Sequence, residues 1–308
     1  MRAVRPAALL ALALAALAAC SPREPATPSN PDDEPTLAPL APGVFVHTSW
    51  KTLEELGRYP AKDLRAFLER VRYPLAVRSS SLLEDSRYQP FTGVYETYMV
   101  PNNATDLDQR LRHLLRAIQR VYASTFSQAA KSYVRATPYR LEEEKMAVIL
   151  QRLVGRPRGP RFYPDFSGVA RSHNFYPHAP LTAQDGIAAV ALGLGRSVVT
   201  EGNCLRFCPR HPQHVVQFST PKDLFRNSQR AFWALDLEAG LHPEQAGLSE
   251  TRYELDVAEA DGALLPVAST WSAENDRVYD GLSRPGVRLV TFAPVLKHGL
   301  FPLAALLQ

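Results

Sequence analysis

The sequence predicts an α+β protein that follows an export-type leader, and three observations support this prediction. Apolar residues recur at helical spacing in two segments, residues 53–71 and 107–134. Short apolar runs, partly β-branched and bounded by turn-forming or charged residues, lie between and after these segments. The first 20 residues combine two arginines with an apolar stretch, which is the pattern of a secretion signal.

The leader MRAVRPAALLALALAALAAC has a basic start, an apolar run from Ala7 to Ala19 and a final Cys20. The run is too short to span a bilayer, which takes about 20 residues. Its last four residues resemble the lipobox of bacterial lipoproteins, which are cleaved before a cysteine that then carries lipid. We therefore expect export and membrane anchoring through lipidated Cys20. The alternative is an accidental leader on a cytoplasmic protein.

The rest of the chain divides by composition into a tether and a folded part. Residues 21–44 are rich in proline and acids without apolar periodicity, so we expect a disordered tether there. Residues 45–308 are long enough for one large or two small domains. Apolar residues make up 45% of the chain and charged residues 21%, which is ordinary for a globular protein.

Net charge argues against one class of partner. The formal charge of +4 falls to +2 if Arg2 and Arg5 are removed with the leader. The sequence also contains no run of lysine and arginine and no basic stripe with interleaved aromatic residues. A dedicated nucleic-acid-binding protein needs such features to neutralise phosphates. We therefore expect no nucleic-acid partner.

Two long helices are predicted in the first half of the folded part. The first covers residues 53–71 and stops before Pro74, because the residue that precedes a proline disfavours helical geometry. The second runs from Leu107 to Val134, with apolar side chains on one face. Thr105 is the expected N-cap of the second helix, because its hydroxyl can accept a hydrogen bond from a backbone N–H group that is unpaired at the start of the helix.

Strands and shorter helices account for the remaining elements. PLAVRS, residues 74–79, is a short buried strand, and MAVILQRLV, residues 146–154, is a central strand, because both are apolar and bounded by turn formers. The others are strands at residues 166–175, 186–194, 251–257 and 287–292, a helix at residues 221–235, and a last helix that begins at Pro294.

Cysteines and acids give little indication of a metal. Cys204 and Cys208 lie in GNCLRFCPRHPQH, whose ligand spacing fits no tight zinc pattern. They can be ordinary thiols, which we favour, a redox-responsive pair in an oxidising compartment, or part of a metal site. The acids Glu142–Glu144, Asp256 and Glu259 are interpreted as solvated faces or turn residues. We assign no metal-ligating residue and no catalytic residue.

The segment YPLAVRSSSLLEDSRYQPFTGVYETYM contains the parts of a phosphate-binding site. Arg78 at a strand end supplies a fixed cation, and Ser79–Ser81 supply hydroxyls. Gly93 in TGVYET lets backbone N–H groups approach closely. The alternative is structural: a strand-end arginine paired with one of the two acids that follow, and an ordinary glycine turn.

The motifs AVRSSSLLEDS, PFTGVYETY, VYAST, EEEKMAVILQRLVG, FSGVA and GLGRSVV occur in an order that is similar to a known family. They resemble the N-terminal nucleotide-binding domain of phosphoenolpyruvate synthase and pyruvate phosphate dikinase, over residues 63–308. The resemblance implies an ATP-grasp-like fold, partial in this chain, in which ATP lies between two α+β lobes. It further implies ATP with Mg²⁺ as ligand and phosphoryl transfer to pyruvate through a swivelling histidine domain.

The same resemblance implies roles for the residues that match the family's motifs. One group corresponds to residues that bind ATP phosphates, and another to the strand whose backbone contacts adenine. Without the resemblance, an apolar strand is more often plain core than an adenine pocket. The implied phosphate-binding residues are Arg78, Gly93, Val94, Tyr95, Glu96 and Thr97, and the implied adenine-binding residues are Gln151, Leu153 and Val154.

Several parts of the family pattern have no counterpart in this sequence. No glycine-rich segment with a lysine precedes Tyr73, and neither Lys51 nor Lys62 has a glycine neighbour. The metal-binding acids, the phosphohistidine domain and the pyruvate barrel are not found before Gln308, and Arg196 follows the GLG turn where glutamate is usual. We expect a nucleotide-binding domain that is not a complete phosphotransferase alone. A second polypeptide could complete it; the alternative is a lipoprotein with a non-catalytic binding module.

Overall fold

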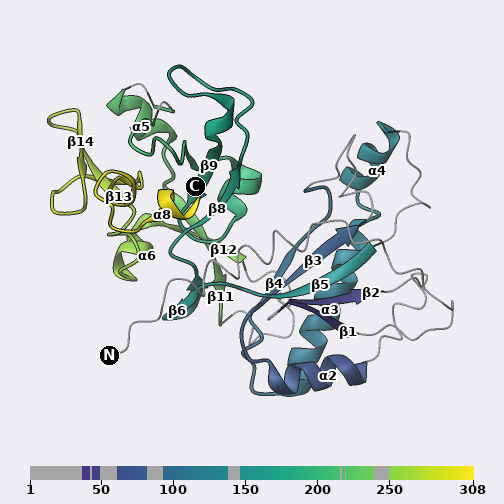
Figure 1. Ribbon diagram of the computed structural model, residues 1–308. Coiled ribbons are helices and arrows are strands. Elements are labelled where there is room, and N and C mark those ends of the chain that lie inside the picture. Colours follow the sequence, from purple (N-terminus) through teal and green to yellow (C-terminus); the bar gives the residue numbers. More distant parts are fainter. Residues whose placement is uncertain are drawn as a thin grey trace. The chain divides into compact units, whose positions relative to one another are not determined.

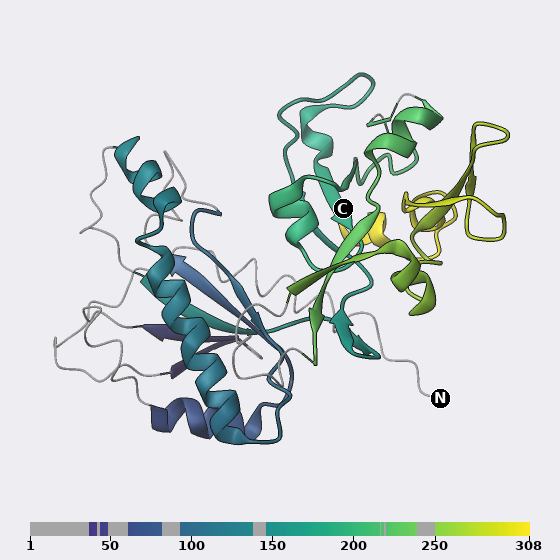
Figure 2. The ribbon, with the colours of Figure 1, turned by 180° about the vertical axis from the view of Figure 1, so that it is seen from behind.

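The computed structural model describes residues 37–41, 44–48, 61–81, 93–137, 146–215, 217–218, 220–238 and 250–308. The leader and the predicted lipidation at Cys20 lie outside these residues, as does the start of the first predicted helix. The chain forms two compact units, whose elements are shown in Figures 1 and 2. The first unit contains Met1–Leu153 and Leu237–Ser249, and the second contains Val154–Asp236 and Glu250–Gln308.

The first unit is built on a five-stranded antiparallel sheet (Figure 1). Its spatial order differs from the order along the chain, because β5 lies between two earlier strands. The apolar run at residues 146–154 is therefore confirmed as a central strand. The strands in spatial order are β1 (Leu37–Ala41), β2 (Val44–Thr48), β5 (Met146–Arg152), β3 (Leu75–Ser81) and β4 (Tyr98–Val100).

The sheet includes residues that the composition assigned to a disordered tether. Leu37–Ala41 pair with β2 as an edge strand, so the predicted boundary at residue 44 is corrected for these residues. The acids that suggested disorder end at Glu34. Pro39 is compatible with an edge strand, where a missing N–H need not interrupt the hydrogen bonding between central strands.

Among the described residues of this unit, three helices accompany the sheet, and their boundaries differ from the prediction. α2 (Ala61–Arg70) and α3 (Leu107–Ser124) pack together, and α4 (Gln128–Arg135) follows. The single helix predicted to reach Val134 is wrong, because Ser127 begins a new helix by accepting the Ala130 N–H at 3.1 Å. Such local hydroxyl bonds compete with a continuing helix.

The N-cap of α3 is Asp106 and not Thr105. Its carboxylate accepts the N–H groups of Asp108 and Gln109, both at 3.1 Å. A carboxylate has two oxygens for two free donors, and its negative charge is also favourable at a helix N-terminus. The prediction of a polar cap was therefore one residue early.

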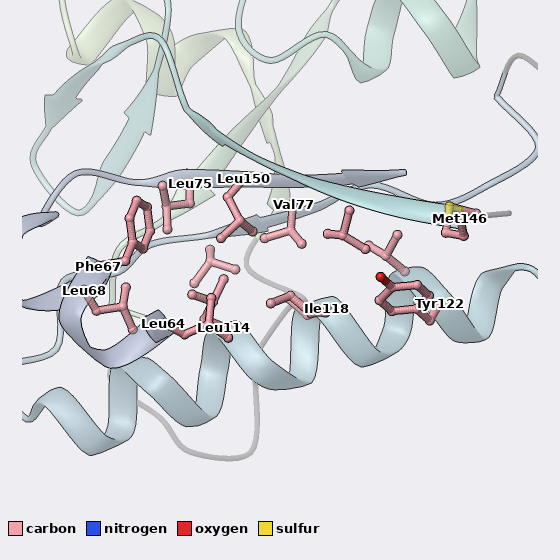
Figure 3. Close-up of a cluster of buried hydrophobic side chains, with 14 of the residues drawn as sticks. Leu64, Phe67, Leu68, Leu75, Val77, Leu114, Ile118, Tyr122, Met146 and Leu150 are labelled. Carbon is pink, nitrogen blue, oxygen red and sulfur yellow. The ribbon is translucent and has the colours of Figure 1, made fainter. Parts of the chain in front are cut away.

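The core of the first unit lies between the helices and one face of the sheet (Figure 3). Because side chains alternate along a strand, every second residue of β3 and β5 faces the helices. The residues between them, including Arg78 and Gln151, face the other way. The fully buried core side chains include Leu64 and Leu68 of α2, Leu114 and Ile118 of α3, Val77 of β3, and Val148 and Leu150 of β5.

His113 on α3 makes the first unit sensitive to acid. Its Nε2 is buried and has no hydrogen-bond partner among the described residues. Burial, and then the charges of Arg116 and Arg112, lower the pKa of His113 below 6.5. The unfolded chain therefore binds the proton more tightly, so the stability from neutral His113 is present above pH 6.5 and is lost as the pH falls towards the folded pKa.

We therefore expect hydrogen-exchange protection of α3 peptides, corrected for intrinsic rates, to fall between pH 7 and about pH 5. His113→Leu should remove most of this pH dependence, because leucine is apolar and does not titrate. Unchanged pH dependence in the variant would contradict the assignment to His113.

The described residues of the second unit form three small antiparallel sheets and short helices. Together with the first unit, these elements confirm an α+β class. The first of these sheets contains β8 (Ser167–Arg171), β9 (Ile187–Ala191) and β10 (Leu205–Phe207). The second sheet contains β6 (Arg156–Arg158), β7 (Arg161–Tyr163), β11 (Ala231–Asp236) and β12 (Glu250–Glu254), and the third contains β13 (Ala268–Ser272), β14 (Arg277–Asp280) and β15 (Val287–Val290). The α-helices described in this unit are α5 (Pro221–Asn227), α6 (Leu255–Ala260), α7 (Ala293–Leu296) and α8 (Leu303–Leu306).

Two predicted elements of the second unit are corrected. The helix predicted over residues 221–235 ends at Asn227, and Ala231–Asp236 form β11 because both β7 and β12 pair with this segment. The strand predicted over residues 251–257 ends at Glu254, where α6 follows. The strands within residues 166–175, 186–194 and 287–292 are confirmed. Among the described residues, no helix has the length and apolar character needed to cross a membrane.

A buried ion pair joins two distant parts of the second unit. Arg161 on β7 donates to Asp261, at the end of α6, through Nη2 at 2.6 Å and Nε at 3.0 Å. The hydroxyl of Tyr163 donates to the same carboxylate at 2.7 Å. The side chain of Asp261 is 8% exposed, so this cluster is almost removed from water.

Candidate functional site

The face of the first sheet that points away from α2 and α3 carries the candidate site. Arg78 of β3 pairs in register with Ile149 of β5, and Ala76 pairs with Gln151. Arg78 and Gln151 therefore occupy diagonal positions on one face, within reach of each other. The Nη1 of Arg78 donates to Oε1 of Gln151 at 3.4 Å, and the side chain of Arg78 is exposed. The two residues predicted to contact different parts of a nucleotide are thus neighbours.

The three predicted serines do not share this face. Ser79 and Ser81 are 7% and 4% exposed and alternate onto the buried face with Val77. Ser80 is half-buried and lies on the face of Arg78. The strand alternation therefore selects Ser80 as the hydroxyl of this segment that can assist Arg78. The sequence of this segment did not reveal the distinction, because three consecutive serines show no alternation that tells which side chains point into the core.

The predicted phosphate loop, residues 93–97, is anchored to α3. Tyr95 belongs to the hydrophobic core and is 5% exposed. The N–H of Glu96 donates to Oγ of Ser124 at 3.2 Å, and the Glu96 carboxylate accepts the hydroxyl of Tyr98. Burial, and then the hydrogen bond to Glu96, raise the pKa of Tyr98 to about 12. Tyr98 therefore remains a donor at neutral pH and holds Glu96 in place.

The ends of the loop remain open to solvent. Gly93 has φ +76°, a conformation that glycine adopts without steric cost, and an added Cβ would meet no atom within 4 Å. Tyr98 pairs with Val77, so the antiparallel register brings the preceding Thr97 level with Arg78. Gly93 and Thr97 are both exposed. Tyr95 is thus the buried anchor of the loop, whereas Glu96 is held by Ser124 and Tyr98 but is exposed, like Gly93 and Thr97.

The predicted adenine strand offers less free backbone than expected. Gln151 pairs with Val44 on one side and Ala76 on the other, because β5 is a central strand and not an edge. The N–H of Leu153 donates to the Pro74 carbonyl at 2.9 Å. Val154 is exposed and is the first residue of the second unit. The side chain of Gln151 is therefore the more accessible group at this position.

Arg196, which departs from the family pattern, has a defined position in the second unit. Its guanidinium carbon lies 4.2 Å from the ring centre of Trp233 and its Nη1 lies 3.9 Å from Glu250. Trp233 Nε1 donates to Glu201 at 2.9 Å. Burial raises the pKa of Glu250, and the charge of Arg196 opposes this shift. Arg196 thus stacks on an aromatic ring and partly compensates a buried acid, which its sequence context did not predict.

The cysteines and acids show no metal-binding arrangement within the described residues. Cys204 and Cys208 are free and buried, and their sulfur atoms face different carbonyls, of Gly202 and Asp185. Burial raises the pKa of Cys204, which favours an unreactive thiol. The described residues hold no group of three or more histidines, cysteines or acids that fits a metal ion.

The other acids considered in the sequence are explained in part. Glu259 accepts two hydrogen bonds from Arg288, at 2.8 and 2.9 Å, so it forms an ion pair and not only a solvated face. These bonds hold the pKa of Glu259 below its ordinary value, although slight burial opposes the shift. Glu142–Glu144 lie outside the described residues.

A comparison with known families decides the relationship. Residues 54–219 match the family described as the AMP/ATP-binding domain of pyruvate phosphate dikinase. The chain belongs to this family. The match covers more than half of the 308 residues and includes Arg78, residues 93–97 and Gln151. The resemblance inferred from the ordered motifs is therefore confirmed at the level of the family.

One curated relative also aligns with part of this family member. It is the uncharacterized phosphotransferase YvkC of Bacillus subtilis (strain 168), 31% identical over 128 residues. The aligned segment is 41% of this chain and 13% of the relative. The chain thus spans a small fraction of the relative's length.

Proposed function

We propose that this chain binds ATP through the sheet face of Arg78, Ser80 and Gln151 and the accessible ends of the loop at residues 93–97. Family membership supports a nucleotide as ligand. The observation that carries the proposal is the β3–β4 register, which brings the open end of the loop level with the exposed Arg78. A cation, hydroxyls and backbone donors then converge, as binding of phosphate oxygens requires.

Each group has a distinct role in this proposal. Arg78 binds phosphate oxygens with its planar guanidinium, which can donate two parallel hydrogen bonds. Its contact with Gln151 is long at 3.4 Å, so little is lost when a phosphate replaces it. The Gln151 amide is then free to bind the ribose or the base. Tyr95 and Glu96 hold the loop in place.

The proposal assigns binding and not turnover to the described residues. Phosphoryl transfer depends on positioning and on screening of the phosphate charge by metal ions held by carboxylates. Within the described residues, no group of three or more histidines, cysteines or acids could hold a metal ion. We propose that a second polypeptide or another part of the protein supplies those acids and the phosphoryl acceptor.

The leader supports a second candidate, a membrane-anchored lipoprotein whose nucleotide module does not turn over. The single observation that favours this second candidate is the lipobox-like ending of the leader at Cys20. Labelling of bacteria that express the chain with an alkyne fatty acid separates the two candidates. Label that disappears in Cys20→Ser favours the lipoprotein, and an unlabelled, unprocessed chain favours the cytoplasmic alternative.

Titration calorimetry of ATP into the purified chain tests the main proposal. We expect saturable binding in the micromolar range, and the titration is made with and without Mg²⁺. AMP should bind more weakly, because it lacks the phosphates that Arg78 would contact. A protein that is folded by circular dichroism and shows no heat of binding with ATP would refute the proposal.

A further inference from the structure

The open face of the first sheet continues towards the start of β3. Leu75 and Val77 point towards the helices in Figure 3, so Ala76 between them points the other way. Ala76 pairs in register with Met99 of β4 on one side and with Gln151 of β5 on the other. Because paired residues of neighbouring strands lie on the same face, these three residues form one row across it, which we call the Met99 row.

The Met99 row differs in chemistry from the rest of the open face. Neither Ala76 nor Met99 has a side-chain N–H or O–H group that could bind a phosphate. Arg78 and Ser80, which lie two and four residues further along β3, have a cation and a hydroxyl. Because β4 is antiparallel to β3, the loop that precedes β4, residues 93–97, lies towards the Ser80 end. The face is therefore apolar at one end and rich in donors at the other.

The spacing along β3 suits the length of a nucleotide. Ala76 and Arg78 are about 7 Å apart along the strand, and Ala76 and Ser80 are about 14 Å apart, because each residue of a strand adds about 3.4 Å. In ATP the ribose separates the base from the first phosphate, and the other phosphates extend further. An ATP molecule laid along β3 can therefore place its base on the Met99 row while its phosphates reach Arg78 and Ser80.

The end of β5 lies beside the Met99 row. The N–H of Leu153 donates to the carbonyl of Pro74, the residue before β3, at 2.9 Å. Gln151 and Leu153 are two of the three residues that the family resemblance relates to adenine. The polarity of the face and the resemblance therefore agree on the end that takes the base. Met99 is not among those residues, because it belongs to β4 and only the strand register brings it to this row.

We propose, on the basis of the proposed binding of ATP, that the base packs on Met99 and that the nucleotide lies along β3 with its outer phosphates at Ser80. A methionine side chain is adaptable, and its sulfur makes favourable contacts with aromatic rings. Met99 is half-buried, so part of its side chain remains accessible to a ligand. The amide of Gln151 then meets the edge of the base, and Ile149, which is level with Arg78, lies beside the ribose.

Titration calorimetry of the full chain with ATP, AMP and tripolyphosphate tests this orientation. Met99→Thr, which keeps a residue suited to a strand, should weaken the binding of ATP and AMP about tenfold each, because an apolar contact with the base is lost. Tripolyphosphate has no base, so its affinity should not change. Met99→Leu should retain most of the ATP affinity. Ser80→Ala should show the reverse pattern, with weaker binding of ATP and tripolyphosphate and unchanged binding of AMP.

Phe126→Thr is the matched control for Met99→Thr. Phe126 is an apolar residue of the same unit and is 42% exposed, but it follows α3, which covers the opposite face of the sheet. Its replacement should leave ATP affinity unchanged. Circular dichroism shows whether each variant is folded.

Three results with a parent chain that binds ATP would overturn the orientation and leave the nucleotide function intact. The first is unchanged ATP binding in Met99→Thr, and the second is an equal loss for ATP and tripolyphosphate in this variant. The third is a loss of ATP binding in Ile149→Ala that exceeds the loss in Met99→Thr, which would place the base on β5. A folded parent chain that binds no ATP would instead refute the proposed function, and the orientation with it.

Discussion

Replacement of Arg78 with methionine should weaken ATP binding by about 10- to 100-fold. Methionine retains an apolar stem but removes the guanidinium that the proposal places on the phosphates. A hydrogen bond to a charged group contributes about 1.5–3 kcal/mol, and each 1.4 kcal/mol is about tenfold in affinity. The ATP affinity of Arg78→Lys should lie between those of the parent chain and Arg78→Met, since lysine keeps the charge but cannot donate two parallel hydrogen bonds. Titration calorimetry measures all three dissociation constants.

Arg152→Met is the matched control for this experiment. Arg152 ends β5 as an exposed cation and pairs in register with Leu75, whose side chain faces the core, so it lies on the opposite face from Arg78. Its guanidinium carbon lies 5.0 Å from the ring centre of Tyr73. We expect ATP affinity to stay within about twofold of the parent chain. An equal loss in both variants would indicate a general charge effect and contradict a specific role of Arg78.

Asp261→Ala should destabilise the second unit by about 3 kcal/mol or more. The substitution leaves Arg161 and Tyr163 without their shared acceptor, and an uncompensated buried charge costs about 3–5 kcal/mol. The Arg161 side chain is 19% exposed, so we expect the lower part of that range. Urea unfolding followed by the fluorescence of Trp233 and Trp271, both in this unit, measures the change.

The same ion pair has a defined pH dependence. Burial alone raises the pKa of Asp261, but hydrogen bonds from Arg161 and Tyr163 lower it below 3.8 in the folded chain. Its stabilisation is therefore present above about pH 4 and is lost as the pH falls through the folded pKa.

Glu254→Ala is the control for Asp261→Ala, because the ion pair of Glu254 with Arg252 is exposed, at 66% and 51% for the two side chains, and contributes less than about 1 kcal/mol. Equal destabilisation by both variants would contradict the role of burial.

The candidate site was predictable where its signals are local. Arg78 at the end of an apolar run and Gly93 in a turn are visible in a few consecutive residues. The orientation of their neighbours was not predictable in this way. Ser79 and Ser81 turn inwards because α3 covers that face of β3, and Glu96 is held by Ser124, which lies 28 positions away. A residue's access to a ligand thus depended on an element that is remote in sequence.

The same limit explains the elements that were predicted incorrectly. The apolar residues of Ala231–Asp236 fit a helix or a strand, and pairing with β7 and β12 decides in favour of the strand. In a similar way Leu37–Ala41 are a strand because β2 pairs with them, although their composition with prolines suggested a tether. Backbone hydrogen bonds between strands need a partner that a local pattern does not contain.

The sequence by itself determined the α+β class, the family motifs, and the central strand at residues 146–154, because periodicity and turn residues act within a short stretch of chain. Only the tertiary structure decided which face of β3 is open and which charges are buried. Arg110 is an example: it is 1% exposed, and its Nη1 donates to the carbonyls of Leu68 and Val71, about 40 residues earlier, whereas its Nε and Nη2 have no hydrogen-bond partner among the described residues. Burying a charge is favourable only where distant acceptors converge on it, and folding alone brings such groups together.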